Sequence, residues 1–163
     1  MTGLGIADTT GDFVTRAVLE LPLVLGGIEG DRHFGLTRKA GVRETHHPRG
    51  AEIMNVRQLS LVSEEELAEL SAALGAPVDW QKLGANLVLR GLPQLTQLAA
   101  SSRLVFPSGA TVVVDGENAP CSKPARALGL PGFVKAAVRR RGLVGWVERA
   151  GLIRVGDGVA LWQ

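Results

Sequence analysis

Cysteine, aromatic residues and long apolar stretches are all scarce in this chain of 163 residues. Its single cysteine excludes an intrachain disulfide and a zinc site made of clustered cysteines. Tyrosine is absent and aromatic residues make up only 4%, so stacking platforms for single-stranded nucleic acid are few. No apolar run approaches the roughly 20 residues that span a membrane. The N-terminal segment lacks the basic and apolar regions of a secretory signal, so we expect one cytoplasmic domain over residues 1–163, with no membrane partner.

A large excess of charge of either sign is also missing. Lys and Arg total 18 and Asp and Glu total 16, for a formal net charge of +2. This balance argues against nucleic acid as a general partner. The positive charge is local: residues 133–142 hold four basic residues, and Lys123 and Arg126 follow the cysteine. Such a cluster suits a phosphate-bearing small ligand, although the arginines at 139–141 equally fit the solvated end of a helix.

The pattern of glycines and β-branched residues predicts a mainly β fold. Glycine occurs 21 times, between short apolar runs that are typical of strands joined by turns. The predicted strands cover residues 17–25, 57–62, 86–91, 102–106, 110–116, 143–149 and 153–162. Residues 107–109 predict a hairpin turn. We expect the strands to form a closed or half-closed β-barrel with a few peripheral helices.

Two helices are expected outside the strands. Ser63, with Glu66 three residues later, forms a capping-box pattern, and Gly75 is placed to end the helix. A second, weaker pattern predicts a helix over residues 133–141, with its basic side chains on one face.

The only cysteine lies in a loop that contains two prolines and two cations. Cys121 is preceded by an Asn-Ala-Pro turn and followed by Lys123, Pro124 and Arg126. Nearby cations stabilise a thiolate, which is the reactive form of cysteine. The alternative is a small buried apolar residue, a common environment for a free cysteine. Local chemistry leaves both interpretations open.

A second polar segment, "GGIEGDRHFG" at residues 26–35, follows a predicted strand. It brings Asp31, Arg32 and His33 together in a glycine-bounded loop, where ligand contacts often concentrate. A surface turn with a chance run of charges is the alternative. His46 and His47 in "ETHHPRGAE" lack the spacing of a metal site and are expected on a solvated loop. Asn86, after a Gly-Ala turn, is expected to cap that turn.

Taken in order, several segments resemble the MOSC domain, which is named after the C-terminal domain of molybdenum cofactor sulfurases. The resemblance covers about Glu20 to Val159, and the Gly-Asp-Arg-His and Asn-x-Pro-Cys motifs carry most of its specificity. The segments are "GIEGDRHFG", "RQLSLVS", "LGANLVLRGL", "SGATVVVDGENAPC" and "GLVGWVERAGLIRVGDGV".

The resemblance implies a single functional cysteine and a cofactor. In this family the cysteine is proposed to carry sulfur as a persulfide for metal–sulfur centres. In relatives that reduce N-hydroxylated compounds, it ligates molybdenum held by a pterin dithiolene. Cys121 occupies the matching position, so the resemblance implies the molybdenum cofactor (Mo-molybdopterin) as ligand and Cys121 as its metal ligand or as a sulfur carrier.

The matching loop implies further site residues. Asp31, Arg32 and His33 are expected to line the same pocket, with His33 or Asp31 as a catalytic proton donor. Their charge and position predict that Asn118, Lys123 and Arg126 flank the thiol and hold the pterin phosphate, together with Arg32. These residues form the cofactor-binding set that we expect.

The sequence also departs from larger family members. Since the resemblance takes up nearly all of the 163 residues, we expect no pyridoxal-phosphate desulfurase domain and no additional N-terminal barrel domain of the kind found in amidoxime-reducing relatives. A single MOSC domain is therefore expected to work with a separate reductase or sulfur-donor protein, or to complete its pocket as a homodimer. The alternative function is a non-catalytic binding module for a phosphorylated small molecule or a protein partner, and the sequence leaves open whether the chain is an enzyme.

Overall fold

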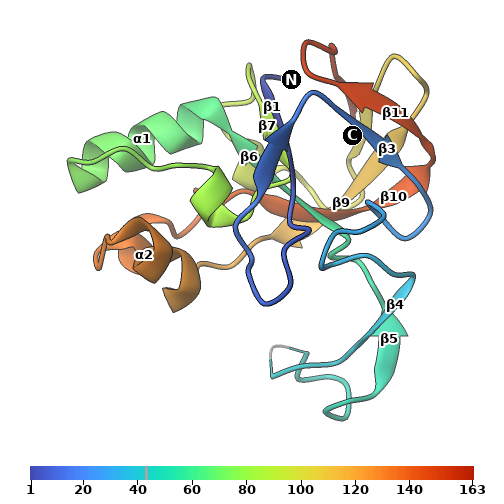
Figure 1. The fold of residues 1–163 in the computed structure, drawn as a ribbon, viewed down its shortest axis with the longest axis horizontal. Coiled ribbons are helices and arrows are strands. Elements are labelled where there is room, and N and C mark those ends of the chain that lie inside the picture. Colours follow the sequence, from blue (N-terminus) through green and yellow to red (C-terminus); the bar gives the residue numbers. More distant parts are fainter. Residues whose placement is uncertain (43) are drawn as a thin grey trace.

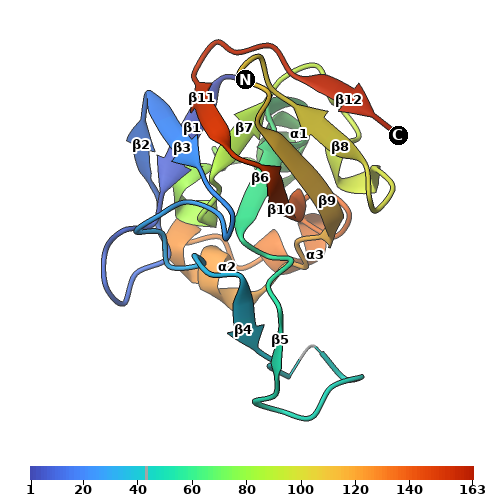
Figure 2. The same cartoon turned by 90° about the vertical axis from the view of Figure 1, so that its right-hand side faces the viewer.

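Short β-strands make up most of the regular structure in this computed structural model, which describes residues 1–42 and 44–163. Eight strands form the main sheet (Figures 1 and 2). Their order is β12 (Ala160–Trp162), β8 (Arg103–Val105), β9 (Thr111–Glu117), β10 (Leu143–Arg149), β6 (Leu59–Ser63), β7 (Leu87–Leu89), β1 (Gly3–Ile6) and β2 (Arg16–Val18). The pairing is antiparallel except between β6 and β7. No helix in the described part of the chain is long and apolar enough to cross a membrane.

Two strand pairs stand apart from the main sheet. One joins β3 (Glu20–Leu23) to β11 (Gly151–Arg154), and the other joins β4 (Thr37–Lys39) to β5 (Glu52–Met54). Side chains of β3 and β11 are buried in the same apolar core as the main sheet. The mainly β prediction is confirmed. Within residues 1–42 and 44–163 no pairing joins the edge strands β2 and β12, so a closed barrel is not found.

Two of the predicted strands are each divided between sheets. Residues 17–25 form β2 and β3, separated by Leu19, whose side chain is exposed. Residues 153–162 form β11 and β12, with Gly156 at a φ of 97° between them. The chain therefore changes sheets at two points where the apolar pattern is continuous. The hairpin turn at 107–109 is confirmed, because β8 and β9 pair on either side of it.

The helices pack on the outer face of the sheet (Figure 1). Helix α1 (Glu64–Leu74) begins and ends as predicted, with Ser63 accepting from the Glu66 amide at 3.3 Å and Gly75 in the left-handed conformation. The Glu66 side chain, however, turns inward. Its buried carboxylate accepts from the amide of Thr96 at 2.9 Å and from its hydroxyl at 2.7 Å. Glu66 therefore ties α1 to the short 3-10 helix η2 (Leu95–Gln97).

The second predicted helix is much shorter than expected. Helix α3 covers only Phe133–Ala136, and the basic residues that follow are outside it. Arg139 has a φ of 60°, which ends helical geometry. Arg141 is buried, and its Nη2 donates to the Leu83 carbonyl of the 3-10 helix η1 (Gln81–Leu83) at 2.7 Å. The prediction of a solvated basic helix end is therefore wrong at Arg141.

Gly142 connects this region to strand β10 through a conformation that favours glycine. Its φ is 86°, and a Cβ atom there would overlap the Leu61 carbonyl oxygen. Its amide donates to the Thr96 hydroxyl at 2.8 Å, and its carbonyl accepts from the Asn118 amide at 2.9 Å. Gly142 thus links the start of β10 to η2 through Thr96 and to the segment after β9 through Asn118.

We expect Gly142→Ala to destabilise the protein by about 3 kcal/mol or more, because it adds both a left-handed strain and a backbone overlap. Gly50→Ala is the matched control, since Gly50 has a φ of 83° and open space around a Cβ atom. Strain alone should cost the control about 1 kcal/mol. Urea unfolding measures both values, and equal losses would contradict a tight contact at Gly142.

Candidate functional site

Cys121 lies where strand β9 gives way to helix α2 (Ser122–Leu128). It occupies the N-cap position in an extended conformation, and its side chain makes no capping hydrogen bond. The residue is half-buried. Pro124, in the first turn of α2, is buried. The residues after the cysteine, which were predicted as a basic loop, thus form a short helix. The Cys121 side chain is left without a role in capping that helix.

A cavity of about 130 Å³ opens next to Cys121. Its walls come from segments that are far apart in the sequence: the 31–35 loop, the start of β6, the 3-10 helix η1, the β9–α2 connection and the start of β10. The lining residues are Phe13, Arg32, His33, Arg57, Leu59, Ser60, Leu83, Gly84, Asn118, Cys121, Lys123, Pro124, Arg141 and Val144. We call this space the inner cavity.

A larger groove of about 740 Å³ adjoins the inner cavity. One wall is the loop over residues 7–13, and the other is formed by Lys123, Arg126 and Ala127 of α2. Phe13, Arg32 and Lys123 line both spaces, so they stand at the junction between them. We call this space the outer groove. A compact group can lie against Cys121 while a larger body extends along the groove.

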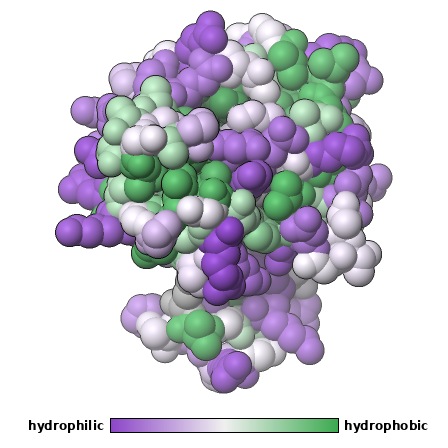
Figure 3. Space-filling view, turned by 60° about the vertical axis from the view of Figure 1, so that its left-hand side comes forward, coloured by the Kyte–Doolittle hydropathy of each residue, from purple (hydrophilic) through white to green (hydrophobic). Residues whose placement is uncertain are grey.

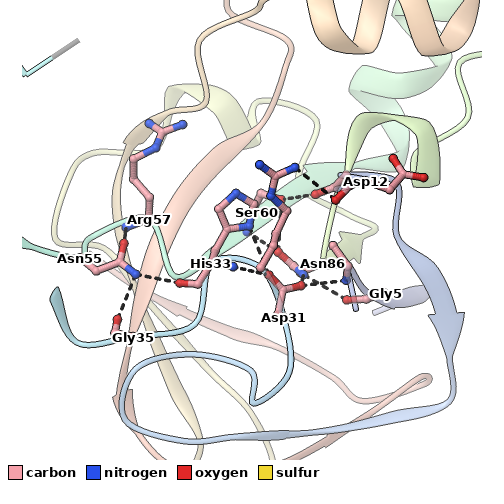
Figure 4. A network of polar contacts seen from close by, with 12 residues as sticks. Gly5, Asp12, Asp31, His33, Gly35, Asn55, Arg57, Ser60 and Asn86 are labelled. Atoms are coloured by element: carbon pink, nitrogen blue, oxygen red, sulfur yellow. Dashed lines mark hydrogen bonds and ion pairs between the residues drawn. The ribbon is translucent and has the colours of Figure 1, made fainter. Parts of the chain in front are cut away.

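Asp31 lies behind this site in a buried network (Figure 4). Its Oδ2 accepts from the Ala7 amide and from Asn86 Nδ2, both at 2.9 Å. Its Oδ1 accepts from the His33 amide at 2.9 Å and lies 3.2 Å from His33 Nδ1. Asp31 lines neither the inner cavity nor the outer groove. The expectation that Asp31 shares the pocket with Arg32 and His33 is therefore wrong, because its carboxylate is turned toward these buried donors.

The charge on Asp31 is held by these contacts. Burial by itself would raise the pKa of this carboxyl, but hydrogen bonds from the His33 side chain and from the amides of Ala7 and His33 outweigh burial. The net effect lowers the pKa of Asp31 below its ordinary value. Asp31 is therefore a buried carboxylate at neutral pH.

Arg32 and His33 do reach the predicted site. The Arg32 backbone amide donates to the Ala7 carbonyl at 3.0 Å, and its guanidinium donates to the Asp12 carbonyl at 3.4 Å. Arg32 therefore holds the loop that forms one wall of the outer groove. The His33 ring lines the inner cavity and is 43% exposed, so it is open to a ligand there.

The predicted cofactor-binding residues divide between the two spaces. Asn118 is buried beside Cys121, and its Oδ1 accepts from Arg57 Nη2 at 3.2 Å. Lys123 lines both spaces, whereas Arg126 lines only the outer groove. The outer groove is therefore lined by three cations, Arg32, Lys123 and Arg126, and on the wall formed by residues 7–13 by the acidic side chains of Asp8 and Asp12. The side of the groove formed by α2 suits an anionic group.

Asn86 has a role that its sequence context did not indicate. It is buried, and its Oδ1 accepts from the Ser60 amide at 2.9 Å. Its Nδ2 donates to Asp31 and to the Gly5 carbonyl. Asn86 therefore joins β1, β6 and the Asp31 loop. The sequence did offer one signal for the burial of Asn86, since this polar side chain begins the apolar segment 86–91.

The sequence also gave no direct signal for Arg57, Ser60 and Arg141 as cavity residues. The Arg57 amide donates to Asn55 Oδ1 at 3.1 Å, and Asn55 Nδ2 donates to the carbonyls of His33 and Gly35. These bonds fix the backbone after His33 (Figure 4). Their partners are distant in the sequence, so no local pattern predicts them.

His46 and His47 lie in the loop of the β4–β5 hairpin, which projects from the body as a separate lobe (Figures 2 and 3). Both are exposed, and neither lines the inner cavity. Across the described residues, no group of three or more His, Cys, Asp or Glu side chains is arranged to hold a metal ion. A metal beside Cys121 would need further ligands from a bound group.

Comparison with known proteins now places the chain. The MOSC domain profile matches residues 29–160. The chain belongs to the MOSC domain family. A Bacillus subtilis (strain 168) relative, named "Putative metal-sulfur cluster biosynthesis proteins YuaD", is 44% identical over 169 residues, covering 96% of this chain and 86% of the relative.

Solved structures agree with this assignment. The crystal structure of Bacillus subtilis YuaD superposes with a TM-score of 0.93 at 44% identity, covering 99% of this chain and 94% of that one. The structure of YiiM from Geobacillus stearothermophilus gives a TM-score of 0.70 at 18% identity, covering 99% of this chain and 73% of that one. At that identity the YiiM match shows only that this MOSC protein shares its fold.

We expect Asp31→Asn to lower the free energy of unfolding at pH 7 by about 1–3 kcal/mol, because an amide cannot accept from all four donors. The pKa of Asp31 is lowered, so the wild type loses this stabilisation as the pH falls from about 3.8 through the lowered pKa. The difference between the two proteins should therefore narrow in acid. Urea unfolding over a pH series, with Asp115→Asn at an exposed position as the control, measures it. A difference that stays constant would contradict the charged, hydrogen-bonded state.

Proposed function

We propose that this MOSC protein binds the molybdenum cofactor or carries sulfur for metal–sulfur chemistry, with Cys121 as the attachment point. The observation that carries the proposal is the position of the single cysteine in a small cavity that adjoins a groove with Lys123 and Arg126 on one wall. Membership of the MOSC family supports a cofactor-related role, and the name of the YuaD relative supports a role in metal–sulfur chemistry.

The size of the two spaces fits a ligand with a compact head and a larger body. The inner cavity, at about 130 Å³, suits a metal or sulfur group beside the thiol. The outer groove, at about 740 Å³, is in the range of roughly 300–1,000 Å³ that is usual for cofactor-sized ligands. The pterin of the cofactor would therefore lie in the outer groove, with its metal end at Cys121.

The side chains suit the same ligand chemically. A thiolate is a soft ligand for thiophilic metals. Because the described residues offer no cluster of three or more metal-ligating side chains, Cys121 would supply one sulfur and the cofactor would supply the others. Lys123, Arg126 and Arg32 would bind the phosphate of the pterin through charge-assisted hydrogen bonds.

When bound, the molybdenum group would supply two-electron reduction of an N–O bond in an N-hydroxylated compound, with electrons from a separate reductase. The chain's own contribution is to hold and enclose the ligand. Phe13 and Leu83 give the inner cavity part of its apolar lining, beside cations such as Arg57 and Lys123. His33, exposed to the same cavity, can exchange a proton with a group bound there.

Sulfur transfer needs only the same cysteine and a persulfide donor. The Cys121 thiolate attacks the outer sulfur of the donor's persulfide, a new S–S bond forms, the donor's S–S bond breaks, and the donor leaves as a thiolate. The product is a persulfide on Cys121, and no net oxidation occurs. The small inner cavity accommodates one additional sulfur atom.

We expect the wild type, purified without oxygen from cells that make molybdenum cofactor, to contain near-stoichiometric molybdenum and pterin. Cys121→Ser should lose most of the molybdenum, because an alcohol is a much poorer ligand for a soft metal than a thiolate. Ser101→Ala, at an exposed position, is the matched control. Metal analysis and pterin fluorescence measure the content.

The same samples distinguish the alternatives. If neither protein holds molybdenum, but the wild type gains the mass of one sulfur atom after incubation with a persulfide donor and Cys121→Ser does not, the sulfur-carrier function stands. If both proteins lack the metal and resist persulfide formation, the proposal fails. The non-catalytic binding module then remains, supported by the cations Lys123 and Arg126 on one wall of the outer groove.

We expect the double variant Lys123→Ala/Arg126→Ala to retain roughly tenfold less pterin than the wild type, because two cations leave the outer groove. Arg149→Ala removes an exposed arginine that lines neither space, and it should retain pterin normally. Persulfide formation on Cys121 should continue in the double variant. Full pterin retention there would show that these cations do not hold the phosphate.

A further inference from the structure

We infer that the inner cavity binds a small divalent oxyanion beside Cys121, and that thiosulfate is the sulfur donor for this cysteine. The inference rests on the proposed function, since it takes Cys121 as a sulfur carrier, and it adds the chemical class of the donor. The observation that points to this class is the set of charges in the cavity lining.

Four cations line the inner cavity, and its lining includes no aspartate or glutamate among the residues that the structure describes. The cations come from four separate segments: the 31–35 loop, the residues just before β6, the first turn of α2 and the residues just before β10. They are Arg32, Arg57, Lys123 and Arg141. Because like charges around one small space repel each other, an anion in that space is attracted by all four.

The acidic residues on the outer-groove side have other partners. Asp8 and Asp12 line the outer groove together with Arg32. Asp8 pairs with Arg16 at 2.6 Å, and Asp12 Oδ1 accepts from two amides of its own loop. Asp31 is turned toward its buried donors behind the site. None of these three carboxylates lines the inner cavity.

The acidic residues on the Arg57 side are also outside the inner cavity. Glu44 and Asp115 share a different surface hollow with Arg57. Glu44 accepts from Arg38 at 2.7 Å and from the Gly41 amide at 2.7 Å, and Asp115 is exposed. These carboxylates weaken the positive potential of the cavity from outside, but they do not occupy it.

Asn118 adds an uncharged donor to the lining. This residue is only 9% exposed, and its Oδ1 accepts from Arg57 Nη2 at 3.2 Å. That bond fixes which end of the amide is the oxygen, because a guanidinium can only donate. Asn118 Nδ2 forms no hydrogen bond with any residue that the structure describes. An N–H donor beside several cations is an environment that suits an oxyanion.

The volume of the inner cavity limits the size of this anion. About 130 Å³ is well below the range of roughly 300–1,000 Å³ that is usual for cofactor-sized ligands, so an anion of a few heavy atoms fits best. Thiosulfate joins a transferable sulfur atom directly to a sulfonate group. The sulfonate oxygens can therefore accept from the cations while the outer sulfur meets Cys121. A donor with no anionic group at its sulfur would leave the four cations without a counter-ion.

The transfer step needs no further reactant. Cys121, as a thiolate, attacks the outer sulfur of thiosulfate, and a new S–S bond forms. The bond between the two sulfur atoms of thiosulfate breaks, and sulfite leaves with the electron pair. The products are a persulfide on Cys121 and one sulfite ion.

The first test measures binding without reaction. Cofactor-free Cys121→Ser protein is titrated with thiosulfate by calorimetry, with the ionic strength held constant by sodium chloride. In this background, we expect Lys123→Ala and Arg57→Gln each to weaken binding about tenfold, because each removes a charge-assisted hydrogen bond. Arg149→Ala, at an exposed arginine that lines neither space, should bind like its parent.

A further variant locates the anion. Arg126 lines the outer groove but not the inner cavity, so Arg126→Ala should weaken binding less than Lys123→Ala does. Equal weakening by the two substitutions would place the anion in the outer groove and overturn the inference. An absence of thiosulfate binding in the Cys121→Ser parent would overturn it as well. Circular dichroism at the assay temperature confirms that the variants compared are folded.

The second test follows the sulfur atom in cofactor-free wild type, with Cys121→Ser as the control. At a pH of about 8.5 an ordinary free thiol is about half ionised, so the test needs no unusual thiol. We expect the wild type to gain the mass of one sulfur atom from thiosulfate and to release an equal amount of sulfite. Lys123→Ala should need about tenfold more thiosulfate for the half-maximal rate.

A second donor separates this inference from the proposed function. If an alkyl persulfide loads Cys121 and thiosulfate does not, the inference is overturned while the sulfur-carrier function stands. If neither donor loads Cys121, the inference and the sulfur-carrier function both fail. Loading by thiosulfate with release of sulfite supports both.

Discussion

One buried carboxylate holds the candidate site together. Asp31 receives hydrogen bonds from Ala7, His33 and Asn86, and these residues belong to the end of β1, the 31–35 loop and the start of β7. A buried charge is stable only when such donors surround it. The Asp31 carboxylate therefore holds the end of β1, the His33 loop and Asn86 together. It also holds the loop that brings His33 to the wall of the inner cavity.

The opposite side of the inner cavity depends on backbone geometry. Gly142 allows β10 to pass close to β6, and its carbonyl holds the Asn118 amide three residues before Cys121. Its amide is bound to Thr96, which in turn donates to the buried Glu66. Helix α1 is thereby coupled through η2 to the cysteine loop. The cysteine loop and the His33 loop are thus held by two networks, and Arg57 joins them. Its Nη2 donates to Asn118 Oδ1, and its amide donates to Asn55, which in turn holds the His33 carbonyl.

Local patterns in the sequence predicted what local interactions determine. The start and end of α1 follow from Ser63 and Gly75, and the β8–β9 hairpin follows from its turn. The divisions of 17–25 and 153–162 were missed, because the partner of each half lies elsewhere in the chain. The burial of Arg141 and Asn86 was missed for the same reason.

The candidate site was predicted in part, and through the family resemblance more than through local chemistry. Cys121, Arg32, His33, Asn118 and Lys123 do line one cavity, whereas Arg126 faces only the groove and Asp31 lies behind it. Direction within a loop could not be read from the order of residues, since Asp31 and His33 are two positions apart but point to different surroundings. The direction of the Asp31 side chain is decided by its hydrogen-bond donors, and two of these, Ala7 and Asn86, are distant in the sequence.

The recessed position of Cys121 also affects its oxidation. A disulfide requires the two sulfur atoms to approach to about 2.05 Å, with the Cα atoms roughly 4.4–6.8 Å apart. Cys121 is half-buried at the edge of a small cavity, and the chain has no second cysteine. Because the chain offers no partner thiol, an internal disulfide cannot end the oxidation of Cys121. What the sulfur becomes after oxidation therefore depends on which molecules can reach the inner cavity.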